Sequence, residues 1–429
     1  MRIIILNQFF YPDHSATSQL MTELAESLVE RGVEVTALAG RGRYNGGERL
    51  SPRDALGGVR IERAWSTSFG KKNAVGRVLD YLSFYLGAAW KMFRLPRHEL
   101  VMALTTPPLI GLVALAVGRL RGLRVVMLVQ DVYPDVAVAL GALSVRNPIT
   151  RLVDWVSRQT LKRADRIVVL SQCMRDRIAA KIGAVSASRI DIIHNWADGS
   201  DIRPLTKEEP NPFAEENQLG GSFVVLFSGN LGRVNDFTTV LEAALLLRER
   251  RDIVFLFVGD GAKSREIEDF SERHELSNMR LLPYQARADL RYSLAAGNAL
   301  LVTLAQGLAG LSVPSKAYAI LAASRPILFV GDARCETARI VEEQRCGAAV
   351  GSGESGKLAQ IIEEWACDKT RLDEMGRAGR ALFEDRFDRL RAVEAYVQSF
   401  EKCMSSTEPL ASASLVRDAK GDCEAEANL

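Results

Sequence analysis

A stretch between residues 307 and 332 has the residue types needed to hold a phosphate group. It reads GLAGLSVPSKAYAILAASRPILFVGD. Its small residues predict a loop, the alanine-rich part from Lys316 to Ala323 predicts a helix, and the apolar run PILFV suits a buried strand. Ser312, Ser315 and Lys316 would then lie at the helix start, where unpaired backbone N–H groups favour an anion. The alternative is an ordinary loop–helix joint whose lysine faces water.

A glycine-containing turn earlier in the same half could contact a diphosphate. Gly229, Asn230 and Arg233 follow an apolar run in the segment FVVLFSGNLGR. Glycine allows the backbone to approach a diphosphate closely, and the cations of Arg233 and Lys316 could neutralise its charge. We expect this turn and the start of the 316–323 helix to lie at the same edge of one sheet.

Two further turns are candidates for contacts with a base and a ribose. Asp260 follows the apolar run DIVFLFVGD, and Tyr284 and Gln285 follow the run MRLL. Each turn would lie at the carboxyl end of its strand, where open α/β sheets bind ligands. The turns at 229–233 and 259–261 and the helix start at 312–316, in this order on one sheet, predict a nucleotide-diphosphate site in the second half of the chain.

The first half offers a loop and a carboxylate at corresponding places. Ser15, Ala16, Thr17 and Ser18 lie between the opening strand MRIIIL and the next helix, at the edge where open α/β sheets bind ligands. Asp131 ends the apolar run LRVVMLVQD and is our candidate catalytic residue. A helix cap or a salt bridge is the alternative role for Asp131. The loop lacks G-x-G-x-x-G, which gives little support to a nicotinamide dinucleotide site.

Alternating apolar runs and amphipathic segments predict the fold that positions these residues. The alternation runs through the first half and starts again after a polar, proline-containing segment, which predicts an α/β protein with two doubly wound, Rossmann-like domains facing across a cleft. Residues 41–58 are predicted to form a loop. The predicted parts are a domain over 1–202, a linker over 203–221, a domain over 222–384, a helix over 385–403 that returns to the first domain, and a disordered tail over 404–429.

The charges of the chain are balanced in total but not in distribution. The 429 residues carry 55 Lys+Arg and 53 Asp+Glu. Residues 1–204 hold 28 basic and 18 acidic side chains, and the remainder hold 27 and 35. A basic half favours an anionic partner, either nucleic acid or an acidic membrane, although chance asymmetry would also explain it. The six cysteines and four histidines are scattered, which indicates reduced thiols and predicts no metal site.

One segment favours the membrane over nucleic acid. Residues 71–98, KKNAVGRVLDYLSFYLGAAWKMFRLPRH, combine a helix rich in aromatic residues with basic residues at both ends. Such a helix can lie in a membrane interface with its cations on anionic headgroups, whereas a core helix with solvated ends is the alternative. The most apolar stretch, 100–118, is interrupted by the sequence TTPP. It is therefore too short to span a bilayer, which needs about 20 apolar residues.

The order of these segments resembles that of the family 4 retaining glycosyltransferases of the GT-B fold. The resemblance is carried by ILNQFFYPDHSATSQLMTELAESLVERGVEVT, QDVYPD, SGNLGRVNDFTTVLEAA, FLFVGDGAKSREIE and VPSKAYAILAASRPIL, and covers nearly the whole chain. It is strongest for bacterial enzymes of colanic-acid, capsule and O-antigen assembly. It implies a nucleotide-diphospho-sugar donor, for which general frequency favours UDP, and it implies that the loop of Ser15, Ala16, Thr17 and Ser18 contacts the sugar or the acceptor. The basic aromatic segment 71–98 favours a polyprenyl-diphosphate-linked saccharide as that acceptor. The resemblance also implies a cytoplasmic enzyme peripherally associated with the inner membrane, with no metal, cofactor or nucleic acid.

The sequence departs from the family pattern at several positions. The family's diphosphate-binding Arg and Lys fall on Asn230 and Asn235, so Arg233 and Lys316 become the expected substitutes. The family's paired glutamates, which contact the donor, fall on Leu311 and Ala319.

A third departure lies in the first half of the chain. The family's histidine in the N-terminal domain is replaced by the pair Gln130-Asp131. Together these losses leave open a catalytically idle scaffold of the same fold. A nucleotide-sugar 2-epimerase also shares the fold, although the VPSK and TTPP segments speak against it.

Overall fold

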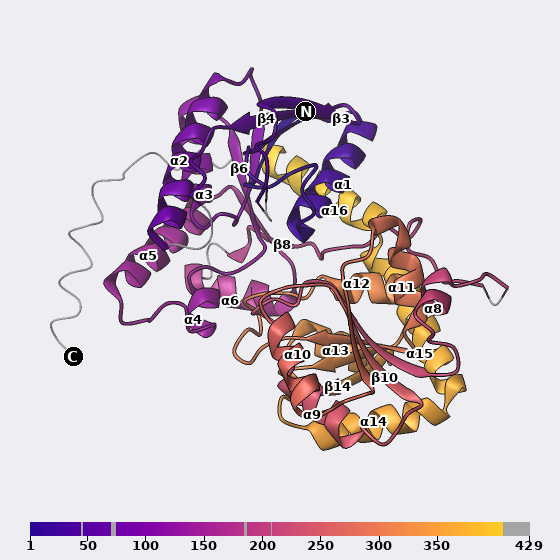
Figure 1. Ribbon diagram of the computed structural model, residues 1–429. Coiled ribbons are helices and arrows are strands. Elements are labelled where there is room, and N and C mark those ends of the chain that lie inside the picture. Colours follow the sequence, from indigo (N-terminus) through magenta and orange to yellow (C-terminus); the bar gives the residue numbers. More distant parts are fainter. Residues whose placement is uncertain (44–45, 70–73, 184–186, 207, 406–429) are drawn as a thin grey trace.

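The protein, seen in a computed structural model, forms two α/β lobes (Figure 1). The structure describes residues 1–43, 46–69, 74–183, 187–206 and 208–405. The predicted disordered tail over 404–429 lies outside the described residues except for 404 and 405. Residues 71–73 of the aromatic segment also lie outside them. Each lobe contains one sheet, and the prediction of two doubly wound domains is confirmed.

The first sheet has eight strands in the order β3-β4-β2-β1-β5-β6-β7-β8. Its strands are apolar runs such as RIIIL and LVMAL, which are buried because helices cover both faces. All neighbouring strands are parallel except β3 and β4. The strands are β1 (Arg2–Leu6), β2 (Glu34–Gly40), β3 (Arg53–Leu56), β4 (Val59–Ala64), β5 (Leu100–Leu104), β6 (Arg124–Val129), β7 (Arg166–Val169) and β8 (Ile190–Ile192).

The prediction that residues 41–58 form only a loop is wrong, because they contain β3. This strand pairs with β4 through a two-residue turn, in which Gly57 and Gly58 have φ angles of 53° and 84°. Positive φ at both central residues is the requirement of a type I′ hairpin turn, which two glycines meet without steric cost. The strand is at the sheet edge and is mostly exposed, so it lacks the apolar pattern that marks the others.

Helices cover both faces of this sheet. In Figure 1, α2, α3 and α5 lie on one side, and α1 lies with α16 on the other. No helix among the described residues is both long enough and apolar enough to cross a bilayer. The helices of this lobe are α1 (Ala16–Glu30), α2 (Ala74–Arg94), α3 (Ile110–Arg121), α4 (Asp135–Ala139), α5 (Pro148–Arg163), α6 (Gln172–Ile182) and the returning α16 (Arg389–Ser405).

The second sheet has six parallel strands in the order β11-β10-β9-β12-β13-β14. Strand β14 and the helix α13 before it were not predicted. The sequence of β14, GAAV, is too short and its residues too small to stand out as a strand. The strands are β9 (Phe223–Ser228), β10 (Ile253–Val258), β11 (Met279–Leu282), β12 (Ala299–Thr303), β13 (Ile327–Val330) and β14 (Gly347–Val350). The helices are α9 (Thr238–Leu246), α10 (Ser264–Arg273), α11 (Leu290–Ala296), α12 (Lys316–Ala322), α13 (Glu336–Glu343), α14 (Ser355–Cys367) and α15 (Lys369–Leu382).

The chain passes between the lobes twice, and the two passages touch. In the first, the predicted linker contains α8 (Pro212–Glu216), which packs on α11, so it is not a free linker. In the second, a π-helical turn (Phe383–Phe387) precedes α16, so the returning helix starts four residues later than the predicted 385. Ala197 of the first passage accepts a hydrogen bond from the Arg389 N–H at 3.0 Å and forms a β-bridge with Asp388.

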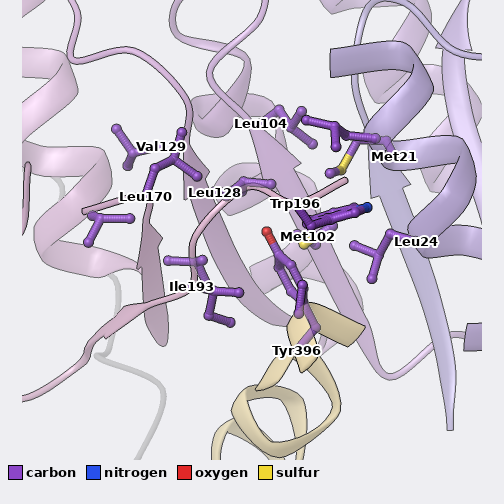
Figure 2. Packing of buried hydrophobic residues seen from close by; sticks show 14 of the residues in the cluster. Met21, Leu24, Met102, Leu104, Leu128, Val129, Leu170, Ile193, Trp196 and Tyr396 are labelled. Carbon is purple, nitrogen blue, oxygen red and sulfur yellow. The ribbon is translucent and has the colours of Figure 1, made fainter. Parts of the chain in front are cut away.

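The returning helix completes the core of the first lobe. Figure 2 shows Tyr396 of α16 beside Trp196, with Met21 and Leu24 of α1 nearby. The two aromatic rings meet edge to face, with centroids 6.0 Å apart and an interplanar angle of 80°. Both residues are buried, and aromatic pairs of this geometry add about 1 kcal/mol beyond the area that they bury. The first lobe therefore depends on residues from the far end of the chain.

Candidate functional site

Two glycines bring the ends of β9 and β10 into close contact. The N–H of Gly229 donates to Val258 O, and that of Gly259 donates to Leu282 O, both at 2.9 Å. Gly259 has a φ of 140°, and a Cβ there would lie 2.1 Å from the carbonyl oxygen of Gly229. Only glycine fits at residue 259, and the backbone edge beside Gly229 is left without side chains of its own.

Lys316 lies at this glycine edge as a buried cation without a counter-charge. Its Nζ is 3.3 Å from the ring centroid of Phe227, and 3.9 Å from where a Cβ on Gly229 would lie. The side chain as a whole is partly exposed, but Nζ is shielded from solvent and has no hydrogen-bond partner in the described part of the chain. Burial lowers the pKa of Lys316 to about 7.

The anion-binding capacity of this edge rests on Lys316 more than on a helix terminus. Helix α12 begins at Lys316 as predicted, but it has only seven residues. Its N-cap residue, Ser315, makes no capping hydrogen bond with its side chain and is only partly buried. An anion with several oxygens is the group that an unpaired, buried ammonium and free backbone N–H groups would bind.

A backbone bridge joins the two lobes at Asp131 and Ser312. The N–H of Val132 donates to Leu311 O at 2.9 Å, and Asp131 and Ser312 form an antiparallel β-bridge. Burial raises the pKa of the Asp131 carboxyl group, and a hydrogen bond from Ser312 opposes that shift. Asp131, the predicted catalytic residue of the first lobe, thus contacts the loop of the second lobe that leads to Lys316.

The turn after β9 is organised by an asparagine rather than by a cation. The side-chain amide of Asn235 donates to Asn230 O at 3.1 Å and to Gly232 O at 3.3 Å, and its oxygen accepts from Thr303 at 3.1 Å. Asn235 is buried, whereas Asn230 and Arg233 are exposed. Asn235 therefore holds the shape of the turn, and Arg233 is the cation that the turn presents to solvent.

The two positions at which the family glutamates are absent have packing roles. Leu311 is buried and Ala319 is partly buried, and both pack in the hydrophobic core of the molecule. The substitution of carboxylates by apolar residues is thus accommodated by the surrounding structure.

The predicted base and ribose residues lie at one rim but differ in availability. The carboxylate of Asp260 accepts from the Gly261 N–H at 2.6 Å and from the Ser264 hydroxyl at 2.9 Å, so it stabilises its own turn. The Tyr284 hydroxyl donates to Asp260 O at 3.4 Å, and its side chain is 54% exposed. The Gln285 amide donates to Pro283 O at 3.0 Å. The Tyr284 ring is the surface most suited to stack on a base.

The first-lobe loop lies before and within the first turn of α1. Ala16 is exposed, Thr17 is partly buried and Ser18 is fully buried. The hydroxyls of Ser15 and Ser18 are shielded from solvent and lack a hydrogen-bond partner among the residues described. Buried hydroxyls normally have a partner, so this loop has unused hydrogen-bonding capacity beside a helix N-terminus.

Sequence reasoning missed a second contact between the lobes. Arg287, just after the Tyr284 turn, forms ion pairs with Glu23 of α1 and with Asp201, the latter at 3.4 Å. The indole N–H of Trp196 also donates to Glu23, at 2.9 Å. No local pattern signals this contact, because it depends on how the lobes dock.

Two small cavities adjoin the two residues of the backbone bridge, one within the first lobe beside Asp131 and one beside Ser312. A cavity of about 30 Å³ is lined in part by Asp131 and Thr105, and another of about 10 Å³ in part by Ser312 and Pro314. Ligand pockets usually measure about 300–1,000 Å³. The described residues contain no group of three His, Cys, Asp or Glu side chains that could hold a metal ion.

Comparison with known proteins assigns each lobe to a family model. A model described as "Glycosyl transferase 4-like domain" matches residues 16–196, and one described as "Glycosyl transferases group 1" matches residues 209–382. The chain is 29% identical over 314 residues to the probable glycosyltransferase WbjE of Pseudomonas aeruginosa, covering 73% of this chain and 77% of WbjE. It is 24% identical over 359 residues to the putative colanic acid biosynthesis glycosyl transferase WcaI of Escherichia coli (strain K12), covering 80% of this chain and 86% of WcaI.

Solved structures agree on the fold. The structure of HepE from Anabaena in complex with UDP and glucose superposes with a TM-score of 0.71 at 15% sequence identity, and the match covers 94% of this chain and 99% of HepE. At that identity the likeness concerns the fold alone.

Proposed function

This chain belongs to the family 4 glycosyltransferases of the GT-B fold, and from that premise we propose that it moves a sugar from a nucleotide-diphospho-sugar to a lipid-linked saccharide. The observation that carries the proposal is the buried, unpartnered Nζ of Lys316 beside Gly229, on the loop that contacts Asp131. We propose that the donor is a UDP-sugar, so that UDP is the leaving group, and that the product belongs to cell-surface polysaccharide synthesis. HepE, which was solved with UDP and glucose, and WcaI, which is named for colanic acid, support these choices.

Lys316 takes the role of stabilising the departing diphosphate. Cleavage of the bond between sugar and diphosphate leaves negative charge on the phosphate oxygens. An ammonium held in a site of low polarity stabilises such charge more strongly than one in water. Exposed Arg233 adds a second cation at the rim, and the backbone edge at Gly229 admits the diphosphate closely. With these groups in place, the reaction proceeds without a metal ion.

Asp131 takes the role of acting on the acceptor hydroxyl. Its pKa is raised by burial, which makes the carboxylate a better proton acceptor near neutral pH than an exposed aspartate. The acceptor attacks the sugar on the same face that the diphosphate leaves, so the anomeric configuration is retained. The proton of the acceptor hydroxyl passes to Asp131 or to the departing phosphate oxygen.

The membrane completes the proposed setting. A polyprenyl-diphosphate-linked acceptor keeps its lipid in the bilayer, so the enzyme works at the cytoplasmic face of the inner membrane, with residues 74–98 of the predicted aromatic segment against it. Ser15, Thr17 and Ser18 line the side of the first lobe from which the acceptor or the donor sugar is contacted.

The first test is a thermal-shift panel of UDP, GDP, ADP, dTDP and their sugars with the wild-type chain and the Lys316→Ala variant. A ligand at a hundred times its dissociation constant stabilises a protein by about 2.7 kcal/mol, which is a shift of several degrees. We expect one diphosphate to stabilise the wild type and to stabilise the variant clearly less, because the same ligand concentration is a smaller multiple of the variant's dissociation constant. An equal shift in the wild type and the variant would show that Lys316 does not contribute to diphosphate binding.

Two other outcomes would replace the proposal. No response to any nucleotide would favour a catalytically idle scaffold of this fold, which the absent glutamates at Leu311 and Ala319 motivate. Release of nucleotide without an acceptor, with a 2-epimer as product, would favour an epimerase. Chromatography of the products with and without a lipid-linked acceptor distinguishes transfer from both.

A further inference from the structure

Helix α2 is apolar on its outer side as well as on its inner side. Phe84, Ala88 and Met92 form the buried stripe that faces the sheet. A helix on a protein surface normally presents charged or polar residues on the opposite side. Here the outward positions are large apolar residues between 45% and 74% exposed: Val75, Val78, Leu79, Leu82, Leu86, Trp90 and Phe93.

The outer sides of α3 and α5 continue this apolar surface. Helix α3 packs against both α2 and α5, so the three lie side by side (Figure 1). The exposed positions of α3 are Leu112, Ala116 and Leu120, spaced four residues apart on one side of the helix, and Leu120 is 78% exposed. On α5, Leu152 and Trp155 are 60% and 56% exposed. Three adjacent helices therefore present apolar side chains where solvent-facing helices present polar ones.

The same three helices carry a strong excess of positive charge. Their sequences contain nine Lys or Arg residues and two Asp. Asp80 accepts hydrogen bonds from the backbone of Phe69, and Asp154 pairs with Arg158 at 2.7 Å. Both acids are engaged within the protein, and so are at least three of the nine cations. Lys91 pairs with Glu62 at 2.8 Å, Arg119 with Asp165 at 3.6 Å and Arg158 with Asp154. The guanidinium of Arg94 lies 4.4 Å from the ring of Trp90, which places a cation within the apolar area.

The combination identifies the chemistry of the partner. A patch of apolar side chains on a soluble domain usually marks a contact with protein or membrane. Aromatic residues mixed with Lys and Arg suit the interface of an anionic bilayer, where rings enter the headgroup region and cations meet phosphates. A protein partner of matching acidity would need an equally apolar face, which is less common than an anionic lipid surface.

The three helices also begin at the edge of the sheet that carries the candidate site. In a parallel sheet, the helix that follows a strand begins near the strand's carboxyl end. The first turns of α2, α3 and α5 therefore lie toward the edge that carries Asp131 and the 15–18 loop. A lipid-linked acceptor in the bilayer could extend its saccharide from this surface to that edge.

We propose that α2, α3 and α5 together form one docking surface for an anionic lipid bilayer, instead of a single interfacial helix over residues 71–98. The role of the surface in presenting the acceptor rests on the proposed function, whereas the binding of lipid does not.

Flotation of the full chain with vesicles tests the proposal. One set contains phosphatidylglycerol and phosphatidylethanolamine, and the other contains only phosphatidylcholine. The α2 variant is Leu86→Gln with Trp90→Gln, and the α5 variant is Leu152→Gln with Trp155→Gln. The matched control is Leu246→Gln on α9 of the second lobe, which is 60% exposed. We expect each double variant to weaken partitioning into anionic vesicles by about tenfold or more, and the control to leave it unchanged.

Three results would overturn the proposal. Loss in the α2 variant without loss in the α5 variant would restrict binding to one helix. Equal binding to phosphatidylcholine vesicles would show that the surface does not require anionic lipid. Light scattering that shows a wild-type dimer converted to monomer by both variants, with no vesicle binding, would make the surface a contact between copies of the chain.

Nucleotide binding, measured by calorimetry on the same proteins, separates this inference from the proposed function. We expect the double variants to bind nucleotide as the wild type does. Vesicle binding without nucleotide binding would refute the transferase function and leave the surface standing, whereas the reverse would refute only the surface.

Discussion

Asp131 of the first lobe and Lys316 of the second are both buried ionisable groups near the junction of the lobes, and they differ in whether the protein satisfies them. Asp131 of the first lobe receives a hydrogen bond from Ser312, and burial raises its pKa. The ammonium of Lys316 in the second lobe lies over the ring of Phe227 and has no hydrogen-bond partner among the residues that the structure describes, and burial lowers its pKa to about 7. The difference indicates a division of roles. The carboxylate has its partner within the fold, and we propose that it moves a proton, whereas the proposed partner of the ammonium comes from outside the protein.

The largest expected effect tests the first half of that comparison. We expect Asp131→Asn to lower the rate of sugar transfer by about 10²- to 10⁴-fold, because general acid–base catalysis contributes about that much. Nucleotide affinity should remain within about twofold, since the amide keeps the shape of the side chain and its contact with Ser312. Steady-state kinetics and calorimetry measure the two quantities. An unchanged rate would assign Asp131 to bridging the lobes alone.

The next effect tests the second half. Lys316→Ala should weaken the binding of the nucleoside diphosphate by about 10- to 150-fold, because a hydrogen bond to a charged group contributes about 1.5–3 kcal/mol. The nucleoside without phosphates should bind equally to both proteins. Arg233→Ala, which removes an exposed cation from the same edge, is the matched control and should cost less, because solvent screens its charge. A larger loss for Arg233→Ala would reverse the assignment.

A pH titration sharpens the comparison. Lys316 is mostly neutral in the free protein above its pKa of about 7, so it must take up a proton to pair with a diphosphate. The affinity for the diphosphate should therefore fall by about tenfold per pH unit above about pH 7, up to the higher pKa that Lys316 has in the liganded state. Below about pH 7 Lys316 is already protonated, so its titration should no longer change the affinity with pH. Lys316→Arg keeps its charge and should flatten the profile. An unchanged slope in Lys316→Arg would show that another group titrates.

The smallest effects are in stability, and their pH windows have opposite directions. The pKa of Lys316 is about 7 in the folded protein and ordinarily 10.5, so its burial costs most below about pH 7 and nothing above 10.5. The pKa of Asp131 lies above its ordinary 3.8, so its burial costs nothing at low pH and most above the raised value. We expect Lys316→Met to stabilise by about 1 kcal/mol at pH 6 and less at pH 9.5. Asp131→Asn should stabilise at least as much at pH 9.5 as at pH 6, and melting curves at the two values check both.

The fold followed from the sequence where burial produces a pattern. Runs such as FVVLFS and IVFLFV are buried on both faces, so they appear as continuous apolar strands. The pattern fails for β3, an exposed edge strand of sequence RDAL, and for β14, made of small residues. It also fails for α8, which is five residues long and stabilised by packing on α11. These elements are determined by their neighbours, which local composition cannot reveal.

The site was predictable within a lobe and not between lobes. Gly229 and Lys316 come together because both follow strands of one parallel sheet, and parallel strands end at a common edge. The hydrogen bond between Asp131 and Ser312, and the ion pair of Arg287 with Glu23, depend on docking between surfaces more than 180 residues apart in the chain. The hydrogen-bonding role of Asn235 within its turn was not predicted either, because the sequence indicated only that asparagine replaces a basic residue of the family pattern there.

The pairing of Ala197 with Asp388 constrains how the lobes can separate to admit a donor. Two strands of chain connect the lobes, and a backbone bond at 3.0 Å fixes them side by side. Two separate connections would allow sliding and twisting, but two that are joined at one point behave as a single pivot. Opening would then take the form of rotation near Ala197, and it would have to break the backbone bridge between Asp131 and Ser312 and the ion pair of Arg287 with Glu23. A donor would thus enter by one rotation that separates Asp131 from Ser312 while Ala197 and Asp388 stay together.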